Sequence, residues 1–199
     1  MNTPIKAPAD FKVLIVYPNL TGMLVPSLAI AIFTKVFKEA GYNTDLFDST
    51  HYVCEENTSP QNRVKFLQAR KFDEHNDLGV RWKDDLLGDF RKKVESFKPD
   101  FMIISVVEDC FRQAISFLET IADLNIPHLI GGVFPTAAPK VVIDNPYIKS
   151  IAIGEGEETL EALLTAAASG ESPESISGLA FRKGDSVIVN PRRPPINSL

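Results

Sequence analysis

Three apolar segments of this sequence run directly into short stretches of small, polar and acidic residues that could bind a ligand. The apolar segments are 101–104, 128–130 and 150–153, and the stretches that follow them are 105–109, 131–135 and 154–158. Glycines in such stretches let a ligand approach the backbone, and carboxylates accept hydrogen bonds from amide and hydroxyl groups. Because Arg112 is the only cation near them in the sequence, the stretches favour a large ligand rich in neutral amides over a bare phosphate.

Common phosphate-binding motifs do not fit these stretches. The dinucleotide motif Gly-x-Gly-x-x-Gly fails at 154–159, because Thr159 stands where the third glycine is needed. A phosphorylated receiver domain needs acidic residues after its first strand, and Tyr17-Pro18-Asn19 offers none. A flavodoxin-like FMN protein stays open as an alternative, although Thr21-Gly22 is a poor phosphate site. Gly131-Gly132 also stays open between two interpretations, a flat surface for a ligand and a tight strand-to-helix turn.

The spacing of apolar residues predicts an alternation of strands and helices. Buried strands read as continuous apolar runs, and helices show an apolar face that recurs every three to four residues. Ser27 is expected to cap the first helix and Gly41 to end it. We expect strands at 12–17, 44–48, 101–105, 127–130 and 149–153, and helices at 28–40, 89–97, 111–124, 139–143 and 157–168.

This alternation indicates an α/β fold, a Rossmann-like (flavodoxin-like) doubly wound sheet of five parallel strands with a C-terminal β-hairpin. Right-handed crossovers favour the strand order 2-1-3-4-5. The switch point of that order lies between strands one and three. The ligand crevice is therefore expected between 18–27 and 105–109, flanked by Gly131-Gly132 and 154–158.

The chain divides into a ligand-binding domain over residues 1–176 and a terminal segment over residues 177–199. Residues 49–88 are polar and weakly periodic, which indicates an insertion over the ligand edge, with a helix at 63–72. In the terminal segment, two short apolar runs joined by Lys183-Gly184-Asp185 predict the hairpin. The prolines after the hairpin predict an exit linker.

Composition excludes several classes of function. The 199-residue chain has a formal net charge of −5, which gives no reason to expect nucleic acid as a partner. No apolar stretch is long enough to span a bilayer, and the first residues lack the layout of a signal peptide. The two cysteines, Cys54 and Cys110, are far apart in sequence and are expected to be free thiols. These features predict a cytoplasmic protein.

Several segments together carry a resemblance to a known family. They are Lys12–Asn19, Pro26–Ala29, Phe97–Asp100, Ile104–Asp109, Gly131–Thr136, Asn145-Pro146 and Ile153–Glu158. In this combination the sequence resembles the N-terminal cobalamin-binding domain of cobalamin-dependent radical S-adenosylmethionine enzymes, over nearly the whole chain. The hairpin and Asn190–Pro194 also resemble the segment that leads toward the catalytic barrel of those enzymes.

The resemblance implies cobalamin, with its cobalt, as the cofactor. The wider cobalamin family binds cobalt through the histidine of Asp-x-His-x-x-Gly, but Asn19-Leu20-Thr21-Gly22 keeps only the glycine. The resemblance implies a corrin ring on the loops after strands one and three and a dimethylbenzimidazole tail that threads past Gly131-Gly132. No histidine from the first loop is expected on cobalt. The residues expected to bind the cofactor are Tyr17, Asn19, Thr21, Gly22, Pro26, Ser27, Ser105, Val106, Val107, Glu108, Asp109, Gly131, Gly132, Val133, Phe134, Gly154, Glu155, Gly156 and Glu157.

The resemblance does not extend to the radical chemistry itself. Radical enzymes hold an iron–sulfur cluster through Cys-x₃-Cys-x₂-Cys, which this sequence lacks. We therefore expect no catalytic residue here, and the cluster and S-adenosylmethionine in a downstream barrel, in cis or in trans, with methyl transfer as the implied reaction. The alternative is a cofactor-free interaction or scaffold domain, whose crevice Met23, Leu24 and Phe134 would block. His51 is expected to be a surface residue rather than a cobalt ligand.

Overall fold

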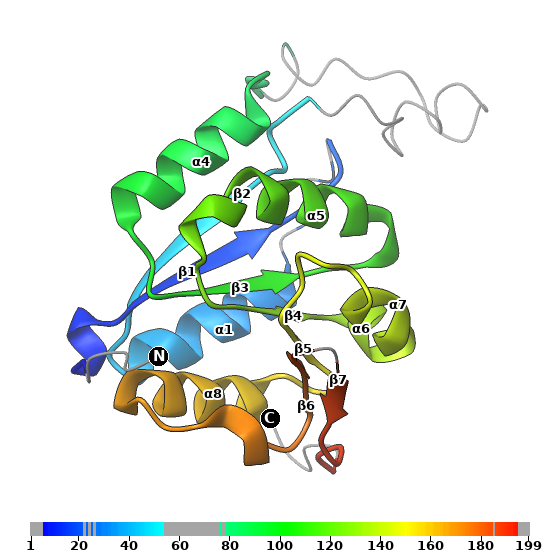
Figure 1. Cartoon of the computed structure of the whole chain (residues 1–199). Helices are drawn as coiled ribbons and strands as arrows, with labels where there is room; N and C mark the ends of the chain where they lie inside the picture. Colours follow the sequence, from blue (N-terminus) through cyan, green and yellow to red (C-terminus); the bar gives the residue numbers. More distant parts are fainter. Residues whose placement is uncertain are drawn as a thin grey trace.

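The computed structural model describes residues 6–21, 23, 25, 27–53, 76, 79–184 and 186–194 (Figure 1). One sheet of seven strands runs through the molecule in the order β2-β1-β3-β4-β5-β6-β7. The strands are β1 (Lys12–Tyr17), β2 (Asn43–Asp48), β3 (Phe101–Ser105), β4 (His128–Gly131), β5 (Ser150–Ala152), β6 (Leu179–Lys183) and β7 (Ser186–Val189).

The parallel part of the sheet has the predicted strand order. Strands β1 to β5 pair in parallel, in the order 2-1-3-4-5. The C-terminal hairpin is also confirmed, and it extends the sheet, because β6 pairs with β5 in antiparallel direction and β7 pairs with β6. The predicted parallel sheet of five strands and the predicted hairpin thus form one mixed sheet of seven strands, and the carboxyl ends of β1 to β5 share one edge.

Helices cover both faces of the sheet (Figure 1). Strand β1 explains why, since alternate residues of a strand point to opposite faces. Val13 and Ile15 pack in the cluster that contains residues of α1 and α8, while Leu14 and Val16 pack in the cluster that contains residues of α4, α5 and α7. All four side chains are fully buried. The helices are α1 (Leu28–Glu39), α4 (Leu86–Phe97), α5 (Phe111–Thr120), α6 (Val133–Ala137), α7 (Pro139–Ile143) and α8 (Glu157–Ser169), with 3₁₀ turns at Pro8–Asp10, Glu108–Cys110, Ala122–Leu124 and Pro173–Ser175.

The ends of α1 lie where the sequence predicts them. The Ser27 side chain accepts a hydrogen bond from the backbone N–H of Ile30 at 3.4 Å, and Gly41 follows the helix with a φ of +83°.

Two other helices differ from the sequence prediction. The helix predicted to run through 111–124 ends at Thr120 and continues as a 3₁₀ turn. The short helix α6 forms where the sequence predicts only a loop.

The two ends of the predicted insertion lie side by side. Tyr52 and Lys83 form a parallel bridge, in which the backbone N–H of Val53 donates to the Lys83 carbonyl at 2.9 Å. The ring of Trp82 contacts the ring of His51 at 6.2 Å between centroids. The helix expected at 63–72 lies outside the described residues, and the placement of the insertion over the ligand edge stays a prediction. No helix within the described part of the chain is long and apolar enough to cross a membrane.

Candidate functional site

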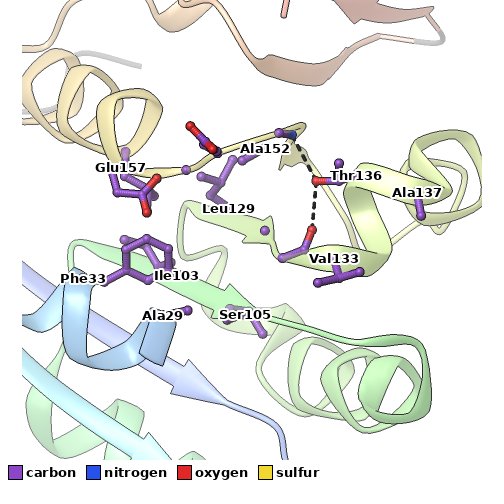
Figure 2. A pocket seen from close by; sticks show the side chains of 17 residues that line it. Ala29, Phe33, Ile103, Ser105, Leu129, Val133, Thr136, Ala137, Ala152 and Glu157 are labelled. Atoms are coloured by element: carbon purple, nitrogen blue, oxygen red, sulfur yellow. Dashed lines mark hydrogen bonds between the residues drawn. The ribbon is translucent and has the colours of Figure 1, made fainter. Parts of the chain in front are cut away.

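A cavity of about 430 Å³ opens at the carboxyl edge of the sheet, between α1, α8 and the ends of β3, β4 and β5. Its volume lies within the range of about 300–1,000 Å³ that is typical of small-molecule sites. Figure 2 shows Phe33 and Glu157 on one side of it and Val133 and Thr136 on the other. The cavity is lined by Ala29, Phe33, Ile103, Ile104, Ser105, Leu129, Gly131, Gly132, Val133, Thr136, Ala137, Ala152, Gly154, Glu155, Gly156, Glu157 and Leu160.

Small residues create this space at positions where the strands and helices would otherwise pack together. Ala29 on α1, Gly131 at the end of β4 and Ala152 on β5 have little or no side chain. Phe33 from α1 and Leu160 from α8 supply apolar walls on the same side of the sheet. The interior is therefore apolar, and it suits a flat or aliphatic part of a ligand.

The loops after β4 and β5 are tied together at the cavity rim. The Thr136 hydroxyl donates to the Gly132 carbonyl at 3.0 Å and accepts from the Gly154 backbone N–H at 3.0 Å (Figure 2). A single side chain on α6 thus fixes the spacing of two glycine-containing loops. Sequence reasoning gives Thr136 no role of its own, since its partners become neighbours only in the folded chain.

The two glycines after β4 have different structural roles. Gly132 has a φ of +113°, and a Cβ there would lie 2.5 Å from the Val106 carbonyl oxygen. Gly132 is therefore required by the close approach of the loops after β3 and β4. A Cβ on Gly131 would meet only Ala152, at 3.7 Å, and Gly131 lines the cavity. The tight-turn interpretation thus applies to Gly132, while both glycines line the cavity and their role as a ligand surface stays a prediction.

Acidic residues supply the polar part of the rim. Glu155 and Glu157 line the cavity, and none of its described lining residues is basic. The Oε2 atom of Glu157 is buried and has no hydrogen-bond partner among the described residues. The next carboxylate, on Glu158, is instead paired with Arg193 at 2.9 Å. Since buried polar atoms are normally paired, the free oxygen of Glu157 indicates an acceptor for a donor group on a ligand.

The first loop, after β1, is held by a buried network rather than open to a ligand. The Asn19 side-chain N–H₂ donates to the Met23 carbonyl at 3.0 Å and to the Thr50 hydroxyl at 2.8 Å. The Asn19 backbone N–H donates to Ser49 Oγ at 2.7 Å and to Gln113 Oε1 at 3.0 Å. Asn19 is only 6% exposed. Because both amide hydrogens are used and the site is enclosed, Asn19 is no substitute for a cobalt-binding histidine.

A second cavity, of about 380 Å³, lies over β1 and β2 on the same edge. The first turn of α1 stands between the two cavities, since Ala29 lines the first cavity and Ile30 and Ala31 line the second. Burial raises the pKa of the Tyr17 phenol at this cavity, although a hydrogen bond with Ser27 opposes the shift. The second cavity is lined by Tyr17, Met23, Val25, Ser27, Ile30, Ala31, Leu46, Asp48, Thr50 and His51.

The residues expected from the sequence to bind the cofactor fall into four groups. Ser105, Gly131, Gly132, Val133, Gly154, Glu155, Gly156 and Glu157 line the first cavity, and Tyr17 and Ser27 line the second. Asn19, Thr21, Val106, Val107, Glu108, Asp109 and Phe134 line neither of them. Gly22 and Pro26, like Leu24, lie outside the described residues.

The larger of these cavities lies beside the predicted crevice, not in it. At the switch point between β1 and β3, the Gln113 side chain from α5 accepts hydrogen bonds from Asn19 and from the Ser49 hydroxyl, the latter at 2.8 Å. Val106 is 1% exposed and belongs to the core. The ring of Phe134 packs against that of Phe111, with 5.0 Å between centroids. The larger open space is consequently over β3, β4 and β5, under α1.

Sequence reasoning missed the apolar lining of the larger cavity. Ala29, Phe33, Leu129 and Leu160 follow the ordinary spacing of core residues, and nothing in that spacing separates a packed position from one that faces a cavity. Cys110 is buried and forms no disulfide bond with a described residue. Among the residues that the structure describes, no group of three His, Cys, Asp or Glu side chains could hold a metal ion.

The chain is a Rossmann-like α/β domain with two cavities at the carboxyl edge of its sheet. No protein-family model matches the chain. Over 116 residues it is 29% identical to the anaerobic magnesium-protoporphyrin IX monomethyl ester cyclase of Rubrivivax gelatinosus, covering 55% of this chain and 21% of the cyclase. Over 115 residues it is 29% identical to the cytidylyl-2-hydroxyethylphosphonate methyltransferase of Streptomyces wedmorensis, covering 56% of this chain and 22% of that enzyme.

Solved structures show the same fold. The radical S-adenosylmethionine methyltransferase TsrM of Kitasatospora setae, with cobalamin and a [4Fe-4S] cluster bound, superposes with a TM-score of 0.67 at 18% identity, over 91% of this chain and 29% of TsrM. The cobalamin-dependent S-adenosylmethionine radical enzyme OxsB, with aqua-cobalamin and S-adenosylmethionine bound, gives a TM-score of 0.62 at 16% identity, over 94% of this chain and 23% of OxsB.

These matches confirm the family resemblance found in the sequence. The chain is similar to cobalamin-dependent radical S-adenosylmethionine enzymes and to related methyltransferases, and its fold is that of one part of such enzymes. The match spans only about a fifth of the length of each of the two curated relatives named above.

Proposed function

We propose that this chain is the cobalamin-binding domain of a cobalamin-dependent radical S-adenosylmethionine enzyme. The observation that carries the proposal is the cavity at the carboxyl edge, which is apolar inside, acidic at the rim and without a basic lining residue among those described. Such a site repels a free anion but accepts hydrogen bonds from amide and hydroxyl groups. Cobalamin combines an apolar heterocycle with many amides and two ribose hydroxyls, and its one phosphate is an internal diester; two of the similar structures contain it.

The residues at the larger cavity fit the nucleotide tail of cobalamin. Phe33, Leu129 and Leu160 offer apolar surfaces to a dimethylbenzimidazole ring. Gly131 leaves room against the backbone, and the buried Oε2 of Glu157 would accept a hydrogen bond from a hydroxyl group of the ribose. Once bound, the cofactor would supply a cobalt-held methyl group, and this chain would hold and orient it.

Cobalt is proposed to be bound without a histidine from the first loop. Asn19 stands near the position of the family's histidine, and its amide is fully engaged with Met23 and Thr50. Thr21 is likewise committed, since its hydroxyl donates to the Tyr52 carbonyl at 2.8 Å. Neither residue of this loop would therefore be a ligand of cobalt.

The remaining parts of the enzyme are proposed to lie in another domain, in cis or in trans. The iron–sulfur cluster and S-adenosylmethionine would be bound there. Methyl transfer is the reaction proposed for the whole enzyme, because several of the similar proteins are methyltransferases. The cytoplasm is its proposed location. Apolar side chains stand exposed around the carboxyl edge, with Val25, Leu28 and Val133 each more than 70% exposed. Exposed apolar groups of this kind are expected to be covered by a ligand or a neighbouring domain.

Reconstitution tests the proposal directly. The purified chain would be mixed with hydroxocobalamin under anaerobic conditions, passed through a gel-filtration column and examined by visible spectroscopy. We expect one corrin per chain to elute with the protein, with the spectrum of cobalamin whose benzimidazole is off cobalt. A chain that elutes without corrin absorbance would overturn the proposal.

A matched pair of variants on α1 tests the place of binding. Ala29→Trp puts an indole into the larger cavity, and we expect it to weaken cobalamin binding by about tenfold or more. Ala40→Trp makes the same change at the exposed far end of the helix, and we expect wild-type binding. Equal binding by both variants would show that cobalamin does not use this cavity.

Electron paramagnetic resonance tests the axial ligand. In bound cob(II)alamin, an axial nitrogen would split the cobalt signal by superhyperfine coupling. We expect no such splitting, because neither the displaced benzimidazole nor a histidine would lie below cobalt. Nitrogen splitting that persists after the tail is replaced by a nitrogen-free one would show that a protein nitrogen is bound.

The alternatives fit the site less well. A scaffold domain was expected to have its crevice blocked by bulky residues, but Phe134 packs against Phe111 and a cavity is open beside it. An FMN protein needs partners for a phosphate, and the rim of that cavity carries Glu155 and Glu157 instead. Retention of flavin colour rather than corrin colour would favour the FMN alternative.

A further inference from the structure

The second cavity has an acceptor that the protein leaves free. Asp48 ends β2 and lines the cavity. One of its carboxylate oxygens, Oδ1, accepts from the Thr50 backbone N–H at 2.8 Å and from the Thr50 hydroxyl at 2.5 Å. This double contact fixes the carboxylate, since Thr50 is itself buried. The other oxygen forms no hydrogen bond with a described residue, so it is available to a ligand.

The charge of this cavity selects for N–H donors. No described lining residue is Lys or Arg, and the negative charge of Asp48 raises the pKa of the Tyr17 phenol, after the larger effect of burial. His51 also lines the cavity, and its ring contacts that of Trp82. A neutral amide would therefore be bound at Asp48, whereas a carboxylate in the same place would be repelled.

The two cavities are close enough for one ligand to reach both. The first turn of α1 separates them, with Ala29 on one side and Ile30 and Ala31 on the other. In cobalamin, the propionamide side chains leave the corrin ring on the same face as the nucleotide tail. If the tail occupies the larger cavity, that face lies against this edge of the sheet, and a propionamide points toward the domain.

We propose that the second cavity binds a propionamide side chain of the corrin ring, with the free carboxylate oxygen of Asp48 accepting a hydrogen bond from the amide N–H₂. This inference rests on the proposed function, because it assumes that the larger cavity takes the tail. The end of β2, far from the glycine loops, would thereby help to select the amide form of the cofactor over its hydrolysed forms.

Corrinoids that differ in one group test the inference. Hydroxocobalamin and its b-, d- and e-monocarboxylic acids, each with one propionamide hydrolysed, would be titrated against the wild-type chain, Asp48→Asn and Asp10→Asn. Asparagine keeps an oxygen for Thr50 and places N–H₂ where the free oxygen was, so it inverts the preference from donor to acceptor. Asp10→Asn makes the same charge change at an exposed position before β1.

We expect the wild-type chain and Asp10→Asn to bind one of the three acids about tenfold more weakly than hydroxocobalamin. For Asp48→Asn, the difference in affinity between hydroxocobalamin and that same acid should shrink to about twofold or reverse. The affinities for the other two acids should not change relative to hydroxocobalamin. If the wild-type chain binds all three acids as tightly as hydroxocobalamin, the inference is wrong, whether or not the variant folds. It is also wrong if Asp48→Asn keeps the wild-type preference. If no corrinoid binds to the wild-type chain, the proposed function itself fails.

Discussion

Gly132 offers the strongest test of how the loops of the site are held. Replacement by alanine would place a Cβ 2.5 Å from the Val106 carbonyl oxygen and 3.0 Å from the Val106 nitrogen. The backbone at Gly132, with φ of 113° and ψ of −169°, is also in a region that is almost restricted to glycine. Backbone strain of about 1–3 kcal/mol and overpacking of about 1–3 kcal/mol together predict a loss of about 2–6 kcal/mol in the free energy of unfolding.

Gly131→Ala is the matched control for that change. Its Cβ would meet only Ala152, at an ordinary 3.7 Å, and alanine in a strand is favoured over glycine by about 0.5–1 kcal/mol. Urea unfolding followed by circular dichroism measures both variants on one scale. We expect Gly131→Ala to unfold at or slightly above the wild-type midpoint and Gly132→Ala far below it. Equal midpoints would refute the close approach of Gly132 to Val106.

Three further predictions concern the first loop and the insertion ends. Ser49→Ala removes a fully buried hydroxyl bonded to Asn19 and should lower stability by about 1–3 kcal/mol, whereas Ser96→Ala, at an exposed position, should leave the urea midpoint unchanged. Asn19→His should not add a nitrogen ligand to bound cob(II)alamin in its resonance spectrum, and should lower the melting temperature, because the amide contacts are lost. Burial, followed by Asp89, raises the pKa of Tyr52 from 10.0 to about 12, so the folded state keeps the phenol proton when the unfolded state has lost it. Stability should be full below pH 10 and fall between pH 10 and about 12, and Tyr52→Phe should remove that part of the fall in pH-dependent unfolding.

The order of the parallel strands could be predicted because each strand is a local signal. The run Lys12–Tyr17 is continuous and apolar, and its inner residues are fully buried by helices on both faces. The ends of α1 could be predicted for the same reason, because Ser27 caps the first turn of the helix and Gly41 follows its last turn with a positive φ. Local sequence signals thus led to the correct parallel topology, and two cavities open at the edge where the site was predicted.

Helix α6 shows where local reading was wrong. The sequence Gly131–Thr136 reads as a loop because it combines two glycines with Pro135. Proline is tolerated in the first turn of a helix, however, because the N–H that it lacks would have no partner there. Pro135 occupies the third position of α6, where it is buried. The turn that follows brings Thr136 into reach of Gly132 and Gly154.

The network around Asn19 could not be predicted from the sequence because its members are far apart in it. Ser49 lies 30 residues from Asn19, and Gln113 lies 94 residues away. Each is an ordinary polar residue in its own segment. Only the parallel pairing of β1 with β2, and the position of α5, bring these side chains to the switch point. These contacts fill part of the predicted crevice.

The polar groups at this edge divide into those that the protein satisfies and those that it leaves free. Asn19 and Ser49 use their side-chain hydrogens within the protein, and they hold the first loop against β2. Glu157 Oε2 and the second oxygen of Asp48 have no partner among the described residues, and both belong to cavity walls. Since leaving a carboxylate oxygen unpaired is costly once a ligand excludes water, a ligand that fills both cavities must bring a donor to each. An amide-rich corrinoid with a ribose tail meets that requirement through its amide N–H₂ and ribose hydroxyl groups.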